Sequence, residues 1–127
     1  MTTVDPQDRI YELHASICKT FANPWRLRIV EVLGDGECTV SQLVDKLGIS
    51  KSNVSQHLGI MRGKGVVDYR REGGFVFYRL SNPKILLACQ LMREVLLEEF
   101  ERVGELTHLE LETSSGESRL TGSMNSD

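Results

Sequence analysis

Apolar residues recur along the chain at three- and four-residue intervals in five segments, which is the spacing of amphipathic helices. The pattern predicts helices over residues 5–21, 24–33, 40–47 and 51–63, and a last helix from residues 81–83 to about residue 104. Before the last helix, two runs rich in β-branched and aromatic residues, 66–71 and 75–80, flank a Glu72-Gly73-Gly74 turn and predict a β-hairpin. The predicted fold is therefore mainly α-helical with one small hairpin.

Capping residues mark the ends of the two central helices. Thr39 and Gln42 have the spacing of a capping box, and Gly48 is well placed to end the third helix in a left-handed conformation. Ser50 can cap the fourth helix, as Asn23 can cap the second. Two short helices joined by a tight glycine-containing turn predict a helix-turn-helix, and the hairpin directly behind it predicts a winged helix-turn-helix.

The same pattern predicts which side chains form the core. On the second helix these are Leu27, Val30 and Leu33, and on the fourth they are Val54, Leu58 and Met61. The last helix carries an apolar stripe from Ile85 to Phe100 that is longer than a small domain needs, and we interpret it as a partner surface. Residues 5–104 are expected to form one domain, and the polar residues 105–127 a disordered tail.

Charge is divided unevenly along the 127 residues, whose net charge is −3. Residues 45–81 carry seven basic and three acidic side chains, whereas 1–44 and 82–127 are both net acidic. A chain that is acidic overall can therefore still present a basic face, as a protein that binds a polyanion requires. The alternative interpretation of this charge is an ordinary solvated surface.

Several classes of protein are not expected. No apolar run approaches the ~20 residues of a membrane span, and residues 1–8 lack the apolar core of a signal peptide. The three cysteines are scattered without a CxxC pair, so we expect a reducing, cytoplasmic location rather than a disulfide scaffold. The sequence has no glycine-rich phosphate loop, no catalytic triad order and no metal-hydrolase spacing, so no enzyme is predicted.

Short polar side chains cluster on the outward face of the predicted fourth helix. Asn and Gln can pair with adenine and Ser can donate or accept, which suits a helix whose N-terminal half enters the major groove. His57 borders the apolar stripe, and we expect it to contact the DNA backbone or to hydrogen-bond within the protein rather than to bind metal. The predicted base-facing residues are Lys51, Ser52, Asn53, Ser55 and Gln56.

Basic residues follow this helix and continue into the hairpin. Arg62 and Lys64 are suited to backbone phosphates. Arg70, Arg71 and Arg79 give the hairpin a basic character that suits the adjacent minor groove or backbone. Double-stranded DNA is therefore the predicted partner. The alternative is a protein-interaction module that uses the same face without specific DNA binding.

Three stretches of the chain resemble the ArsR/SmtB family of regulators. They are FANPWRLRI at 21–29, GISKSNVSQHL at 48–58, and the wing segments GVV at 65–67 and GGFVFYRL at 73–80. The resemblance covers roughly residues 8–103 in the correct order. It implies a homodimer through the first and last helices, a palindromic operator, and a repressor that an inducer releases.

The chain departs from the metal-sensing members of that family. Many of these carry a CxC pair at the start of the third helix, where this sequence has Thr39 and Ser41, with Cys38 just before them. Hydroxyls are poor ligands for soft metals, and the last helix has no histidine for a zinc site. We therefore predict no metal site of either kind.

The three cysteines are compatible with more than one kind of inducer. Cys18 and Cys89 lie on the first and last predicted helices, where oxidation or persulfide transfer would change the dimer interface. A thiophilic metalloid such as trivalent arsenic would need about three thiolates, with Cys38 as the third. The remaining alternative is that all three cysteines are inert packing residues.

Overall fold

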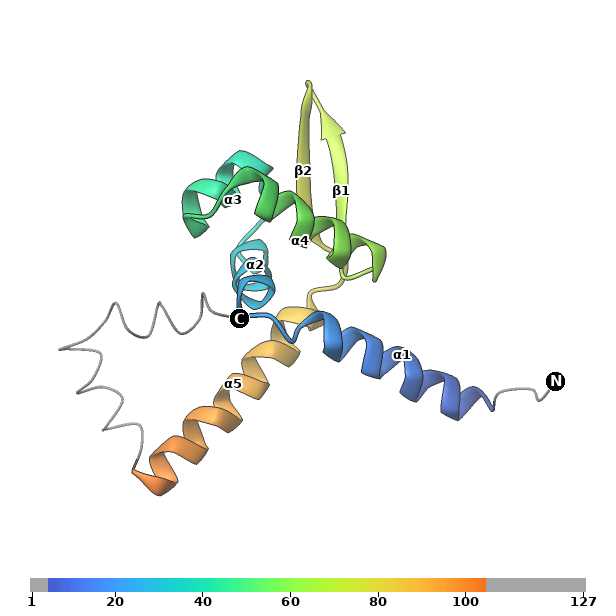
Figure 1. The fold of residues 1–127 in the computed structure, drawn as a ribbon, viewed down its shortest axis with the longest axis vertical. Coiled ribbons are helices and arrows are strands. Elements are labelled where there is room, and N and C mark those ends of the chain that lie inside the picture. Colours follow the sequence, from blue (N-terminus) through green and yellow to red (C-terminus); the bar gives the residue numbers. More distant parts are fainter. Residues whose placement is uncertain (1–4, 105–127) are drawn as a thin grey trace. The chain divides into compact units, whose positions relative to one another are not determined.

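The computed structural model describes residues 5–104, which form five helices and one hairpin (Figure 1). The order is the predicted one, and most boundaries agree to within one residue. The last helix begins at Lys84 rather than at 81–83, because Asn82 caps it by accepting a hydrogen bond from the Lys84 N–H at 2.9 Å. The elements are α1 (Pro6–Thr20), α2 (Pro24–Gly34), α3 (Val40–Leu47), α4 (Lys51–Gly63), β1 (Val67–Glu72), β2 (Phe75–Leu80) and α5 (Lys84–Val103).

The predicted caps of the helix-turn-helix are confirmed. The Thr39 side chain accepts from the Gln42 N–H at 3.2 Å, and the Gln42 side chain accepts from the Thr39 N–H at 2.8 Å. Gly48 ends α3 with φ of +72°, a backbone region that side chains with a Cβ rarely adopt. Ser50 then caps α4 by accepting from the Asn53 N–H at 3.2 Å. These local bonds fix the turn between α3 and α4.

The hairpin is an antiparallel pair closed by a two-residue turn at Gly73 and Gly74. Both glycines have positive φ, +56° and +83°, as a tight turn that follows the right-handed twist of the strands requires. Cys38 adds an isolated bridge to β2, since its N–H and C=O both bond with Tyr78, at 3.0 and 2.7 Å. The segment before α3 is therefore bonded to the wing.

The core lies among α2, α3, α4 and the start of β1, and α4 runs from beside α3 to the base of the hairpin (Figure 1). The prediction that Leu27 is buried was wrong, because its side chain is 37% exposed. Ile29, fully buried, takes that place in the core of α2. The buried apolar side chains are Ile29, Val30, Leu33, Cys38, Leu43, Leu47, Val54, Leu58, Met61, Val66 and Val67.

The described residues 5–85 and 86–104 fall into two separate units, so most of α5 belongs to the second. No residue of α5 is buried, and its exposed apolar side chains include Leu91, Met92 and Val95. On α1, in the first unit, Ile10 and Tyr11 are also more than half exposed. None of the helices within 5–104 is long and apolar enough to cross a membrane. The predicted tail, 105–127, lies outside the described residues.

Candidate nucleic-acid interface

The N-terminal half of α4 presents an exposed polar surface. Val54 and Leu58 are buried, and their four-residue spacing fixes which side of the helix faces outward. Lys51, Ser52, Asn53, Ser55 and Gln56 are all exposed, as predicted. The Ser52 hydroxyl lies 3.2 Å from that of Ser50, whereas Asn53, Ser55 and Gln56 have no side-chain hydrogen bond to any residue of 5–104. These three side chains are therefore available to a ligand.

Of the two contacts expected for His57, the structure shows the hydrogen bond within the protein. Its Nδ1 accepts a hydrogen bond from Arg26 Nε of α2 at 3.2 Å. Desolvation by burial lowers the pKa of His57, and the nearby charge of Arg26 lowers it further. The imidazole is therefore held in its neutral form, which can accept this bond.

Arg26 links three elements, and sequence reasoning missed it. Besides His57 on α4, it donates through an Nη atom to the backbone carbonyl of Thr20, the last residue of α1, at 3.2 Å. Lys64, at the end of α4, makes a second link to α1 through the Ser16 hydroxyl at 2.8 Å. The end of α1 is thus bonded to the helix that carries the polar surface. Arg26 had no distinguishing sequence signal other than its place after Asn23-Pro24.

The arginines of the hairpin differ in their pairing. Arg70 donates to the Glu37 carboxylate at 3.0 and 3.1 Å and to Glu72 at 2.6 Å. The bonds from Arg70 lower the pKa of Glu37, and those from both glutamates raise the pKa of Arg70. Arg79 lies 3.4 Å from the Asp68 carboxylate. Arg70 and Arg79, predicted to face DNA, therefore have their charges offset within the protein.

Arg62 and Arg71 contact an aromatic ring instead of a carboxylate. The guanidinium carbon of Arg62, in the last turn of α4, lies 4.2 Å from the centroid of the Tyr69 ring. That of Arg71, on β1, lies 5.7 Å from the same centroid. Neither arginine has a salt bridge to a carboxylate of residues 5–104. Tyr69 was not singled out from the sequence, because its role depends on an arginine from another element.

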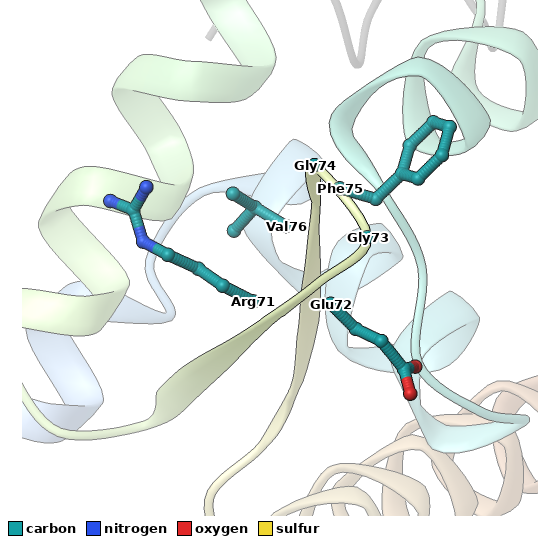
Figure 2. A pocket seen from close by; sticks show the side chains of 6 residues that line it. All are labelled: Arg71, Glu72, Gly73, Gly74, Phe75 and Val76. Carbon is teal, nitrogen blue, oxygen red and sulfur yellow. The ribbon is translucent and has the colours of Figure 1, made fainter.

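A shallow hollow surrounds the hairpin turn, lined by residues 71–76 (Figure 2). Arg71 and Val76 extend to one side of the hairpin, whereas Glu72 and Phe75 extend to the other (Figure 2). Phe75 is 61% exposed at the tip. The hairpin therefore has two chemically distinct faces.

The three cysteines lie in different environments. Cys38 is 4% exposed, and its thiol faces the Gly36 carbonyl at 3.9 Å. Cys18 is exposed on α1 and Cys89 is half-buried on α5, each in a different unit. In the described part of the chain, no group of three or more His, Cys, Asp or Glu side chains is arranged to hold a metal ion.

Comparison with known proteins identifies relatives of this chain. A regulator of Mycobacterium tuberculosis, described as an uncharacterized HTH-type transcriptional regulator, is 39% identical over 88 residues, which cover 68% of this chain and 77% of that protein. The biofilm growth-associated repressor of Xylella fastidiosa is 39% identical over 92 residues, 72% of this chain and 77% of the repressor. The transcriptional activator HlyU of Vibrio cholerae is 37% identical over 79 residues, 62% of this chain and 73% of the activator.

Solved structures agree with the sequence relatives. The crystal structure of the M. tuberculosis regulator superposes with a TM-score of 0.68 at 36% identity, covering 79% of this chain and 99% of that one. A homodimeric winged helix-turn-helix DNA-binding domain of Mycobacterium bovis gives 0.71 at 27% identity, covering 79% and 93%. The profile of the family "Bacterial regulatory protein, arsR family" matches residues 23–69. The chain belongs to the ArsR family and is a winged helix-turn-helix transcriptional regulator.

Proposed function

We propose that the protein is a homodimeric repressor that binds a palindromic operator in double-stranded DNA. The observation that carries the proposal is the exposed face of α4, where Asn53, Ser55 and Gln56 are free of partners within residues 5–104. Hydroxyl and amide groups on the N-terminal half of such a helix can reach base edges in the major groove. Since the DNA of a bacterium lies in its cytoplasm, we propose that compartment for its action.

The uncovered helices support a dimer as the binding form. Large apolar side chains on α1 and, separately, on α5 are exposed to solvent in the single chain, and an exposed apolar helix face is typical of a protein interface. The M. bovis domain, with the same fold, is homodimeric. A two-fold dimer presents two copies of α4, and it would read two half-sites about one helical turn apart.

Repression is the direction of regulation that we propose. The X. fastidiosa relative is a repressor and matches more of this chain than the V. cholerae activator does. For the inducer we retain the two thiol hypotheses, with Cys18 and Cys89 as the sensing pair. Burial of Cys38 makes it a poor third ligand for a metalloid, which favours oxidation or persulfide transfer over metalloid binding.

The decisive experiment is a fluorescence anisotropy titration with a labelled duplex from upstream of the protein's own gene. We expect tight binding by the reduced protein, with an affinity that falls steeply as salt rises, by a log–log slope of about −0.9 for each phosphate contacted. Binding that is insensitive to salt and sequence, or absent across a genomic duplex pool, would support the interaction module instead. Equal binding by oxidised and reduced protein would reject thiol oxidation as the inducing signal and leave the repressor, and metalloid binding to reduced thiols, intact.

The direction of regulation has its own test. A reporter gene behind the same duplex is expected to rise in expression when the protein is deleted. A fall in expression would identify an activator that uses the same DNA interface. Substitution of Cys18 and Cys89 by Ser, with unchanged release by every oxidant tried, would show that these cysteines do not sense the inducer.

A further inference from the structure

The strand register separates the arginines of the wing onto two faces. Because side chains alternate along a strand, Tyr69 and Arg71 lie on one face of β1, and Arg70 and Glu72 lie on the other. Glu37 and Glu72 offset the charge of Arg70 on its face. On the face with Arg71, no carboxylate of residues 5–104 pairs with it.

Arg62 of α4 joins Arg71 on that second face. The guanidinium carbons of both arginines lie within cation–π distance of the Tyr69 ring, at 4.2 Å for Arg62 and 5.7 Å for Arg71 from its centroid. An aromatic ring attracts the flat face of a guanidinium and leaves its N–H groups free to donate. Holding two positive charges near one neutral ring, with no paired carboxylate, costs electrostatic repulsion that an anion bound beside them would relieve.

We propose that Arg62, Tyr69 and Arg71 form a binding site for a phosphate of the DNA backbone, which bridges α4 and the wing. The corollary is that Arg70 and Arg79 brace the wing and do not contact DNA. The proposal rests on the proposed function, because it assigns the phosphate contacts of that same interface. Compared with the DNA contacts predicted from the sequence, the proposal adds Tyr69, whose ring orients both arginines, and removes Arg70 and Arg79.

The chemistry of the site favours phosphate over a base. The N–H fork of arginine matches the paired oxygens of a phosphate, and two such forks exceed what one base edge offers. Arg62 lies in the last turn of α4, whereas the side chains suited to bases lie in its first two turns. Phosphate contacts fix the register of a protein on DNA, so this site would hold α4 and the wing on the same stretch of backbone.

The test uses the full-length protein and an operator duplex in which single phosphates are replaced, one at a time, by neutral methylphosphonates. We expect wild-type affinity to fall about tenfold at one phosphate, or two adjacent ones, in each half-site. Arg62→Met and Arg71→Met should weaken binding to unmodified DNA and be insensitive to that same replacement. Each should also lower the salt slope, and the double variant should lose less than the sum of the two.

Arg70→Met and Arg79→Met are the matched controls within the same hairpin. We expect both to keep the wild-type pattern of sensitivity to the methylphosphonates. Arg62→Lys, which keeps the charge but lacks the planar fork, should bind between wild type and Arg62→Met. Circular dichroism and thermal melting of each variant separate loss of contact from loss of fold.

Tyr69 is tested by a pair of substitutions. Tyr69→Phe keeps the ring and should bind DNA as the wild type does, whereas Tyr69→Leu should bind about two- to fivefold more weakly. The proposal is overturned if wild-type protein binds the operator but Arg62→Met and Arg71→Met keep its methylphosphonate sensitivity, or if Arg70→Met loses it. Failure of wild-type protein to bind any duplex would instead reject the proposed function, and this site with it.

Discussion

Gln56 shows how a single exposed side chain on α4 can be tested for base recognition. Its amide has no partner within residues 5–104, and an amide can pair with two atoms of adenine at once. We expect Gln56→Ala to weaken operator binding by about 1–3 kcal/mol while leaving binding to unrelated duplex unchanged. Competition titrations with both duplexes measure the two affinities.

The control for this substitution is Gln7→Ala, which removes an exposed glutamine of α1 far along the chain from α4. It should leave both affinities unchanged. An equal loss on specific and unrelated DNA in Gln56→Ala would mean that Gln56 contacts the backbone, and the base-facing assignment of this position would be wrong.

The lowered pKa of His57 predicts that the stability of the protein depends on pH. Its pKa lies below the ordinary value of 6.5 in the folded protein, so the unfolded chain binds a proton that the folded chain does not. The free energy of unfolding should therefore fall as pH decreases through about 6.5, until the folded state also takes up the proton. His57→Gln, which can still accept from Arg26, should show a shallower loss across this range.

Urea unfolding at a series of pH values from about 8 to about 5, a range that brackets the ordinary pKa of histidine, measures this change in the free energy of unfolding. His14→Gln is the control, since His14 is exposed on α1 and makes no side-chain hydrogen bond within residues 5–104. Identical pH profiles for wild type and His57→Gln would show that the Arg26–His57 bond does not depend on the neutral imidazole.

At the scale of the elements, two glycines of the helix-turn-helix differ in backbone conformation, one in the turn before α4 and one within α4. Gly48 has φ of +72°, whereas Gly59 lies within α4 and has no positive φ. A Cβ added at either position meets nothing within 4 Å, so space does not distinguish them. Gly48→Ala should therefore destabilise the protein by about 1–2 kcal/mol, and Gly59→Ala should stabilise it by up to about 1 kcal/mol.

Denaturant unfolding of the two variants, compared with wild type, checks this pair. Opposite signs are expected because only the backbone conformation differs between the sites. Equal changes would mean that the turn at Gly48 relaxes to accept a side chain. The orientation of α4 would then depend on packing of Val54 and Leu58 more than on the turn.

The elements that sequence predicted well are those decided by neighbouring residues. The capping box of Thr39 and Gln42, and the cap at Ser50, need only residues three positions apart. The pairing of Arg70 with Glu37 joins residues 33 positions apart, and no local pattern indicates it. For the same reason Leu27 was placed inside and Ile29 was missed, since three-residue spacing alone does not fix how α2 is rotated against its neighbours.

At the scale of the whole molecule, one part of the candidate DNA interface could be predicted from local sequence and the other part could not. The polar face of α4 could be predicted, because helical periodicity separates Val54 and Leu58 from the outward residues. The wing arginines could not be sorted, because their availability depends on tertiary partners such as Glu37 and Tyr69. Composition identified residues 45–81 as net basic. Only the structure distinguishes arginines that are paired with a carboxylate, such as Arg70, from arginines that have no salt bridge within residues 5–104, such as Arg71.

The dimer is a prediction that concerns the whole molecule, and it follows from the exposed apolar side chains of α5. Val95 is 56% exposed in the single chain, and an interface with a second copy would bury it. Val95→Glu should then place a charge in that interface and shift the protein toward monomer in analytical ultracentrifugation. Operator affinity should fall with it, because one α4 can read only one half-site at a time.

The control substitution is Glu94→Gln, at the neighbouring exposed position of α5, which should leave the sedimentation of the protein unchanged. A duplex with a single half-site separates dimer loss from damage to α4: Val95→Glu should bind it as wild type does, while losing only the gain that a second half-site provides. If Val95→Glu remains dimeric and binds the full operator normally, the apolar face of α5 is covered by something other than a second copy.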